Sequence, residues 1–179
     1  TERLFQKEIK VLTNKDVNKP SDNPVDALNA LALRARLETV DQSKRNISMT
    51  KSMLQNTETV VYQISELMQR VSELTVQGAS DSYGPNDKLS ISYEIDQLLE
   101  QMFIAGNNKT ESIHIFAGTQ NDTKPYVAER DASGRIIKVT TNGTSGDVQR
   151  VIGQNVQIKG NVNGEDLFEG SEPLFDLLI

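Results

Sequence analysis

The chain has 179 residues, a formal net charge of −6 and no cysteine, and aromatic residues make up only 5% of it. The lack of cysteine excludes disulfide bonds, thiolate metal sites and cysteine nucleophiles. The acidic balance, with lysines and arginines scattered along the chain, argues against a nucleic-acid partner, because sequence-independent binding requires clustered basic residues. No run approaches the ~18 apolar residues of a membrane span, and no charged-then-apolar secretory leader follows Thr1, so we expect no membrane partner.

Residues 1–12 predict a short helix with four apolar residues on one side: Leu4, Phe5, Ile9 and Leu12. Residues 13–21 are polar, and Pro20 ends regular structure there, so we interpret them as a linker. A stretch without internal proline or glycine then predicts one long helix over 24–77. Asn23 is a suitable N-cap, and Pro24 suits the first helical position. A helix of this length is a rod of roughly 75–80 Å, as in a coiled coil or the shaft of an assembly.

Apolar residues recur in the long helix at intervals of seven: Val40, Ile47, Leu54, Val61 and Met68. The positions between them are polar at first and apolar later: Ser43, Thr50, Thr57, then Ile64 and Val71. The seam is thus half polar from about 40 to 57 and apolar from 60 to 76. Two interpretations remain open. Either the middle of the helix is partly solvated, or its half-polar face receives another subunit.

A second helix is predicted over 85–107, where apolar residues form a single stripe: Ile91, Ile95, Leu98, Met102 and Ala105. The connection between the two helices is short and contains Gly78 and Gly84. A short connection makes consecutive helices antiparallel neighbours. We therefore expect Ile91–Met102 to cover the 60–76 face.

After Asn108 the pattern changes to alternating β-branched residues, which predict four strands: Lys124–Glu129, Ile136–Thr141, Val148–Ile152 and Val156–Lys159. Asp131–Gly134 and Asn142–Gly146 have the composition of hairpin turns. Residues 173–179 are apolar and predict the start of a helix. The expected fold is α+β: an elongated rod domain of antiparallel long helices (1–112 plus 169–179) with an inserted small antiparallel β domain (113–168).

No pattern for catalysis, cofactor binding or metal binding emerges. His114 is the single histidine and has no cysteine partners, so we interpret it as a structural residue. One acidic group deserves comparison with calcium loops: Asp81, Asp87, Glu94 and Asp96. Its spacing does not match, so first-turn and solvated-face charges are the preferred interpretation. Gly-rich phosphate loops are also absent from the sequence. We predict a structural protein that is not an enzyme, with no catalytic, cofactor-binding or metal-binding residues and no cofactor.

Pro20–Val25, Leu67–Ala79 and Ile115–Thr119 are three stretches that together resemble the flagellin superfamily and, within it, the hook–filament junction family. Pro20–Val25 is similar to the family's P-S-D-[DN]-P segment at the start of the long helix. Leu67–Ala79 resembles the L-x-x-[VA]-R-E-L-[AS]-V-Q-A signature, with Ser72 where arginine is usual. Ile115–Thr119 is similar to the family's Y-L-F-A-G-T segment. The three occur in the family's order, and with weaker similarity at Asn107 and Gly164–Phe168 the resemblance spans nearly the whole chain.

The resemblance implies a structural subunit of the bacterial flagellum that joins hook to filament and seeds filament assembly. Its implied partners are neighbouring copies in a ring, other hook-associated proteins, flagellin, and the flagellar type III export apparatus or a chaperone. It implies an extracellular location and further terminal segments that pair as a coiled coil, so residues 1–179 alone are expected to be monomeric in light scattering. The alternatives are a flagellin or, from another class, a secreted adhesin or enzyme with a helical stalk.

The resemblance also raises the question of immune recognition, because flagellins are read by an innate receptor on the signature helix. Arg70, Leu74 and Glu94 match that pattern in residue type and spacing. The alternative, which we favour, is that these three residues serve helix packing and assembly only.

Overall fold

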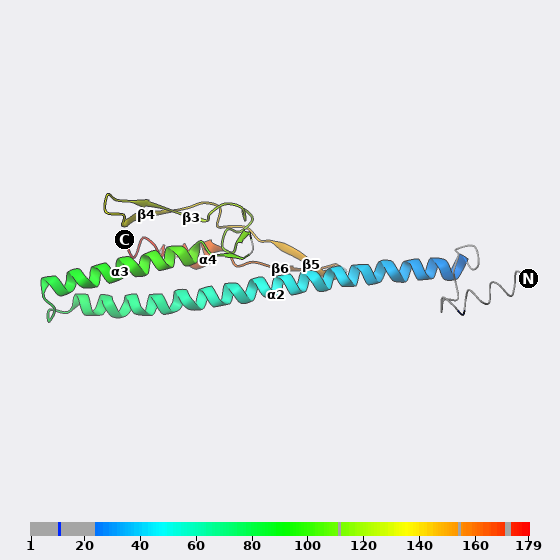
Figure 1. Ribbon diagram of the computed structural model, residues 1–179, viewed down its shortest axis with the longest axis horizontal. Helices are drawn as coiled ribbons and strands as arrows, with labels where there is room; N and C mark the ends of the chain where they lie inside the picture. Colours follow the sequence, from blue (N-terminus) through cyan, green and yellow to red (C-terminus); the bar gives the residue numbers. More distant parts are fainter. Residues whose placement is uncertain (1–10, 12–23, 111, 154, 171–172) are drawn as a thin grey trace, which may run out of the picture.

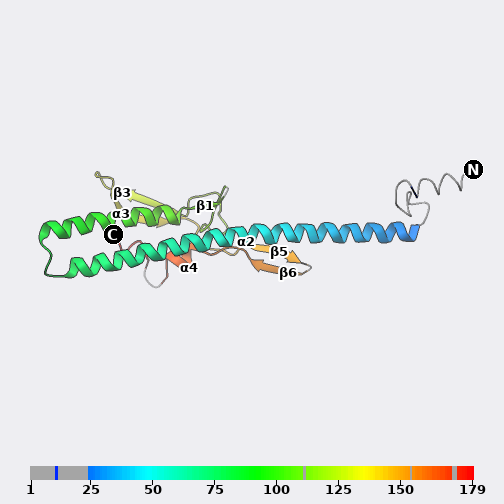
Figure 2. The ribbon, with the colours of Figure 1, turned by 60° about the horizontal axis from the view of Figure 1, so that its bottom comes forward.

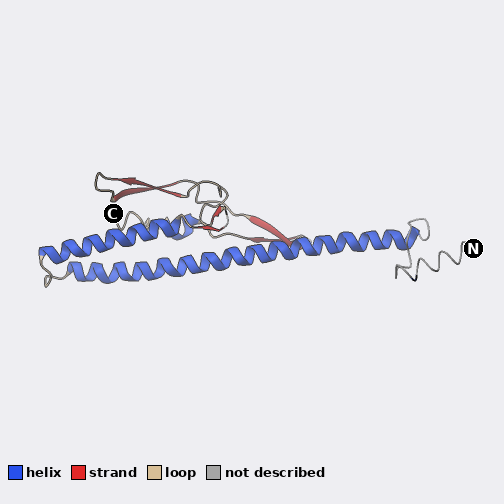
Figure 3. Cartoon of the chain, viewed as in Figure 1, coloured by secondary structure: helices blue, strands red, loops and turns tan. Residues whose placement is uncertain are grey.

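The computed structural model describes residues 11, 24–110, 112–153, 155–170 and 173–179. Apart from Val11, the helix predicted over 1–12 and the linker over 13–21 lie outside the described residues. The described elements follow the order (Figure 1): α2 (Pro24–Ala79), α3 (Pro85–Gly106), β1 (Lys109–Thr110), β2 (Ile113–His114), β3 (Tyr126–Arg130), β4 (Ile136–Thr141), β5 (Gln149–Gly153), β6 (Val156–Lys159) and α4 (Gly164–Phe168). Long helices thus precede short strands along the chain, as Figure 3 shows by colour.

Helix α2 is a single unbroken helix of 56 residues that forms the long axis of the molecule (Figure 1). The predicted helix over 24–77 is confirmed and extends two residues further. At about 1.5 Å per residue, α2 is ~84 Å long. Residues 24–42 are almost entirely exposed, and this end projects beyond the other described elements. The remaining elements therefore lie along the other two thirds of α2.

Helix α3 runs back along the C-terminal half of α2, as its short connection requires (Figure 2). Pro85 occupies its first turn, and the Gly84 N–H donates to Asp87 Oδ2 at 3.0 Å. The two helices share one core of buried apolar side chains: Val60, Ile64, Val71 and Leu74 from α2, and Leu98, Leu99, Met102 and Ala105 from α3. The expected packing of α3 against the 60–76 face is confirmed.

The strands form three separate two-stranded antiparallel sheets, β1–β2, β3–β4 and β5–β6. Asp131–Gly134 is a hairpin turn, as predicted, because β3 and β4 pair across it. The hairpin predicted at Asn142–Gly146 is wrong, because this segment joins β4 to β5 and these two strands do not pair. Its glycines do adopt positive φ, at +77° and +106°, yet β5 pairs with β6 instead. Turn residues permit a reversal of the chain; strand partners are chosen by tertiary packing.

A second correction concerns the end of the chain. The helix start predicted over 173–179 is a run of turns in the structure, and residues 164–168, predicted within the β domain, form α4. Both segments close an aromatic cluster of four buried rings: Phe116, Tyr126, Phe168 and Phe175. This cluster continues the α2–α3 core and ties the last described residues to it.

Candidate assembly surface

The middle of α2 has two distinct faces. One stripe is buried and includes polar as well as apolar residues: Thr50, Met53, Thr57, Val60 and Ile64. The apolar residues at intervals of seven lie on the other face, where Val40, Ile47 and Leu54 are 61%, 46% and 37% exposed. The intervals of seven therefore mark an outward-facing stripe in this part of α2. We call Leu33, Val40, Ile47 and Leu54 the outer seam.

The buried threonines are satisfied within the helix itself. Thr50 Oγ1 donates to Asn46 O at 2.8 Å, and Thr57 Oγ1 donates to Met53 O at 2.9 Å. A hydroxyl that bonds to the carbonyl four residues earlier presents its methyl group to the neighbours. The half-polar middle is thus compatible with burial, which the one-letter pattern did not reveal.

This arrangement predicts that Thr57→Val raises the free energy of unfolding by about 0.5–1 kcal/mol, because an extra methyl is buried while Met53 O keeps its helical hydrogen bond. Thr59 makes the same bond, to Gln55 O at 3.0 Å, but is exposed. Thr59→Val is therefore the matched control and should change stability by less than ~0.5 kcal/mol. Urea unfolding followed by circular dichroism measures both, and a loss of stability in Thr57→Val would contradict the interpretation.

The β5–β6 hairpin lies against the middle of α2, about a hundred positions away in sequence (Figures 1 and 2). Asn46 Nδ2 donates to Val151 O at 2.7 Å, and Arg150 Nη1 lies 3.8 Å from Met49 Sδ. Solvation and another subunit were the two interpretations of the half-polar middle, and the structure instead places a segment of the same chain against it. The partner is β5–β6, and no local signal in α2 identifies it.

The hairpin leaves the outer seam open and forms one wall of a groove beside it. A hollow of ≈520 Å³ is lined by Val40 and Ile47 of α2 and by Ile152 of β5. A second hollow, of ≈270 Å³, continues along Ile47 and Leu54 to Ile158 of β6. Three basic residues and one acidic residue flank the groove on α2: Arg36, Lys44, Lys51 and Glu58. The groove is apolar with mainly basic edges, which suits the apolar stripe of a helix that has mainly acidic flanks.

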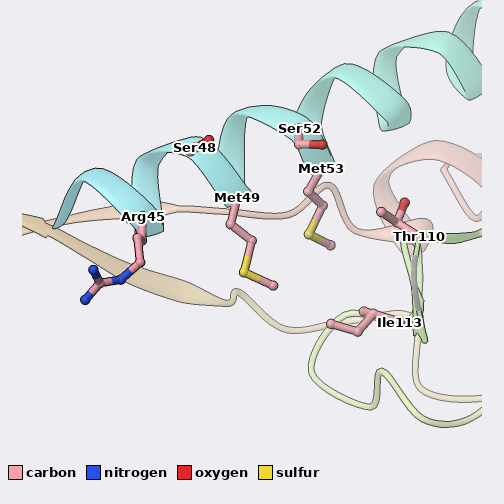
Figure 4. A pocket seen from close by; sticks show the side chains of 7 residues that line it. All are labelled: Arg45, Ser48, Met49, Ser52, Met53, Thr110 and Ile113. Atoms are coloured by element: carbon pink, nitrogen blue, oxygen red, sulfur yellow. The ribbon is translucent and has the colours of Figure 1, made fainter. Parts of the chain in front are cut away.

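A third hollow, of ≈310 Å³, lies between α2 and the β1–β2 sheet (Figure 4). Met49 and Met53 point from α2 toward the segment that carries Ile113, and Arg45 lies at one end. Methionine side chains adapt to irregular apolar partners. The lining contains no carboxylate, histidine or cysteine. This hollow can accept an apolar side chain, and nothing in its lining supports catalysis.

The signature residues Arg70, Leu74 and Glu94 are brought together at the α2–α3 contact. Arg70 Nη2 donates to Glu94 Oε1 at 2.7 Å, and Arg70 Nη1 donates to Glu73 Oε2 at 3.1 Å. These carboxylates, Glu94 first, raise the pKa of Arg70 above its ordinary value. Leu74 is only 1% exposed, so it serves the core and has no surface to offer a receptor. The packing interpretation holds for Leu74, and Arg70 with Glu94 clamps the two helices.

The acidic residues considered for calcium do not converge. Asp87 caps α3, Glu94 pairs with Arg70, and Asp96 Oδ2 lies 3.0 Å from Arg135 Nε. Among the described residues, no three histidine or acidic side chains are grouped so that they could hold a metal ion. Within the same residues, none of the helices combines the length and apolar character needed to cross a membrane.

His114 is buried at 2% exposure, and its Nδ1 lies 3.1 Å from Asn107 O. Burial, aided by the positive charge of Lys109, lowers the pKa of His114 below its ordinary value of 6.5. The folded state thus favours the neutral ring, which can donate from Nδ1 to the carbonyl. Its role in the structure is to hold β2 against the end of α3.

The lowered pKa of His114 predicts how stability depends on pH. The contribution of His114 to the free energy of unfolding is fully present above pH ~6.5 and is lost as the pH falls through the folded-state pKa, because the unfolded chain binds the proton first. The slope attributable to His114 is at most about 1.4 kcal/mol per pH unit. Urea unfolding at a series of pH values measures it, and His114→Gln should remove this component of the slope. An unchanged slope in that variant would contradict the assignment.

A model of the bacterial flagellin N-terminal helical region matches residues 4–121, well over half of the chain. The chain belongs to the flagellin family. The superfamily resemblance read from Pro20–Val25, Leu67–Ala79 and Ile115–Thr119 is thereby confirmed, and this flagellin-family chain has α2 and α3 within the matched region.

Curated relatives of the family are filament proteins. The flagellar filament 30.7 kDa core protein of Treponema maltophilum is 23% identical over 130 residues, which are 72% of this chain and 43% of that protein. A flagellin of Xenorhabdus nematophila is 28% identical over 116 residues, 64% of this chain and 37% of the relative. The chain thus spans about two fifths of the length of the curated relatives that it matches.

Solved structures with the same fold are hook-associated proteins. The flagellar hook-associated protein 3 of Legionella pneumophila superposes with a TM-score of 0.69 at 20% identity, covering 78% of this chain and 41% of that one. FlgL of Bacillus cereus superposes with a TM-score of 0.59 at 25% identity, covering 85% of this chain and 71% of its own. The expected α+β fold with a long helical rod is therefore confirmed.

Proposed function

We propose that this chain is part of a structural subunit of the bacterial flagellum that joins hook to filament and seeds filament assembly, without catalysis. The observation that carries the proposal is the shared fold with hook-associated protein 3 and FlgL over 78–85% of the chain. The S-D-N-P segment at the start of the long helix and the small β region also favour a junction protein. The proposed location is the extracellular flagellum, reached through the flagellar type III apparatus.

A strain that lacks the gene tests this function by electron microscopy. We expect hooks without filaments and flagellin released into the medium, because a missing junction leaves flagellin no surface on which to assemble. Restoring the gene should restore filaments. Normal filaments in the deletion strain would overturn the proposal.

The second candidate is a flagellin, since the curated relatives named above are filament proteins. The number of copies per flagellum separates the two roles. A junction protein is present as a few copies per flagellum, whereas a filament subunit is the most abundant protein of the isolated structure. Quantitative mass spectrometry of purified flagella provides the count.

We further propose that neighbouring copies form a ring and that the outer seam is a contact between them. Charge supports a second copy as the occupant. Residues 34–51 carry five basic and two acidic residues, a formal +3, and residues 59–94 carry five acidic and two basic residues, a formal −3. The mainly basic edges of the groove in one copy thus complement the acidic α2–α3 end of the next. Other hook-associated proteins, flagellin and an export chaperone are the further partners proposed.

A photocrosslinking residue at Ile47 tests the seam contact in assembled flagella, with Lys138, exposed on β4, as the control position. The proposal predicts a crosslinked species of twice the subunit mass from Ile47 and less from Lys138. Crosslinks confined to a single chain would show that a helix of the same chain fills the groove, and would overturn the seam as a contact between copies. A species with the mass of a different flagellar protein would also contradict it.

The division into a rod domain (1–112 plus 169–179) and a β domain (113–168) is likewise proposed here. The strands form separate two-stranded sheets, and β5 packs on α2, so the β region is stabilised by its contacts with the rod. Limited proteolysis would test the division, since cleavage near residues 112 and 169 is expected first.

A further inference from the structure

The β3–β4 hairpin lies over α3 and is attached to it in two different ways (Figures 1 and 2). At its root, Tyr126 is fully buried and its N–H donates to Asn107 Oδ1 at 3.2 Å. Near its turn, two arginines reach two carboxylates on α3. The root is thus anchored in the core, whereas the far end is held by charge.

The first ion pair is bidentate. Arg130 Nη1 donates to Glu100 Oε2 and Nη2 to Glu100 Oε1, both at 2.8 Å. The same guanidinium donates to Gly134 O at 2.9 Å, which closes the turn, and lies 5.9 Å from the Phe103 ring centroid. Such fork-shaped pairs fix orientation as well as distance. Arg130 therefore connects the turn, the strand and α3 at one point.

The second ion pair lies one helical turn away. Arg135 Nη2 donates to Asp96 Oδ1 at 3.2 Å, and Arg135 Nε lies 3.0 Å from Asp96 Oδ2. Asp96 and Glu100 are four residues apart and so lie on one face of α3. The two arginines flank the turn Asp131–Gly134 on either side. Four charges thus hold the hairpin at two points, which defines its angle over the helix.

Apolar packing between the turn and α3 is incomplete. A hollow of ≈260 Å³ lies there, lined by all four charged residues and by Leu99 and Ile136. Ile136 is buried in the core, and Ala128 and Val139 pack against it, but Val127 and Ile137 of the hairpin are 46% and 51% exposed. Beside the turn, Ile136 is thus the apolar side chain that resists separation of this end of the hairpin from the helix, and the ion pairs supply the other contacts.

We propose that Asp96, Glu100, Arg130 and Arg135 form an ionic latch that sets the angle of the β3–β4 hairpin over α3. When the latch is weakened, the hairpin swings away about its buried root at Tyr126. The four side chains are 20–50% exposed, so salt reaches and screens them. The latch thereby governs how the exposed Val127 and Ile137 are presented to the surroundings.

Distance measurement between two spin labels tests the latch, and the cysteine-free chain allows labels at Ile137 and Gln101 without background. At about 0.1 M salt we expect one narrow distance distribution. At about 1 M salt, where the Debye length falls from ~10 Å to ~3 Å, most molecules should move to longer and broader distances. The double variant R130Q/R135Q should show the longer distances already at the lower salt.

The matched control is K138Q, which removes a positive charge from the same hairpin but breaks only the pair of Lys138 with Glu129, 3.6 Å apart. K138Q should keep the narrow distribution. Exchanging the two charges, with Arg130→Glu and Glu100→Arg in one variant, forms the ion pair in the opposite sense and should give the narrow distribution at the lower salt. A narrow distribution at high salt and in R130Q/R135Q would overturn the latch; if that variant fails to fold, the salt series on the parent chain decides.

Discussion

Replacing Gly118 with alanine is expected to lower the free energy of unfolding by about 2–4 kcal/mol, because both conformation and crowding oppose a side chain there. Gly118 has φ of +55°, which L-residues rarely adopt. A Cβ atom would run into the Ser145 carbonyl group and lie 3.1 Å from Ser145 N. Ser145 O already accepts from Thr119 N at 3.3 Å, so that backbone is held in place. Urea unfolding by circular dichroism measures the loss.

Gly134 provides the matched control for this substitution. Its φ is +88°, but nothing lies within 4 Å of a Cβ atom built on it. Gly134→Ala therefore carries only the conformational cost, about 1–2 kcal/mol. The difference between the two variants isolates the crowding against Ser145. Equal losses in both would show that the close approach of the two segments contributes nothing.

Phe168→Ala is expected to destabilise the fold by about 3–5 kcal/mol, the range for a buried aromatic ring replaced by a methyl group. Phe168 is 1% exposed, and its ring centroid lies 4.9 Å from that of Tyr126, 5.2 Å from Phe175 and 5.5 Å from Phe116. Each of these three rings would lose a direct contact. Urea unfolding gives the magnitude of the loss.

Hydrogen exchange shows where this loss occurs. Leu174 N donates to Phe168 O at 2.8 Å, so residues 173–179 should lose protection first. Tyr62→Ala, at a position 68% exposed, serves as the control and should change stability by less than about 0.5 kcal/mol. If Phe168→Ala changes stability as little as the control, the ring cluster does not contribute to the common core.

Elements whose signals are local could be predicted from the residues alone. Pro24 and Pro85 mark the first turns of α2 and α3, since a missing N–H has no cost there. The apolar residues of α3 recur at alternating intervals of four and three, and the connection to α2 is short. Together these two features predict that α3 packs on α2. β4 and β6 have the predicted bounds, because alternation of β-branched residues depends only on neighbours in the chain. Family membership followed from short stretches read in order.

Which surfaces of these elements are covered depends on contacts between segments that are distant in sequence. The sevenfold repeat in α2 gave no indication that Thr50 and Thr57 are buried while Ile47 and Leu54 face outward, because β5–β6 arrives from about a hundred residues away. The turn-forming residues of Asn142–Gly146 allowed a hairpin that the packing of β5 on α2 replaced. Local patterns specify the periodicity of a helix or strand and the places where the chain can turn. Which elements pack together depends on contacts between distant residues, and these contacts place the outer seam and the ionic latch on the surface.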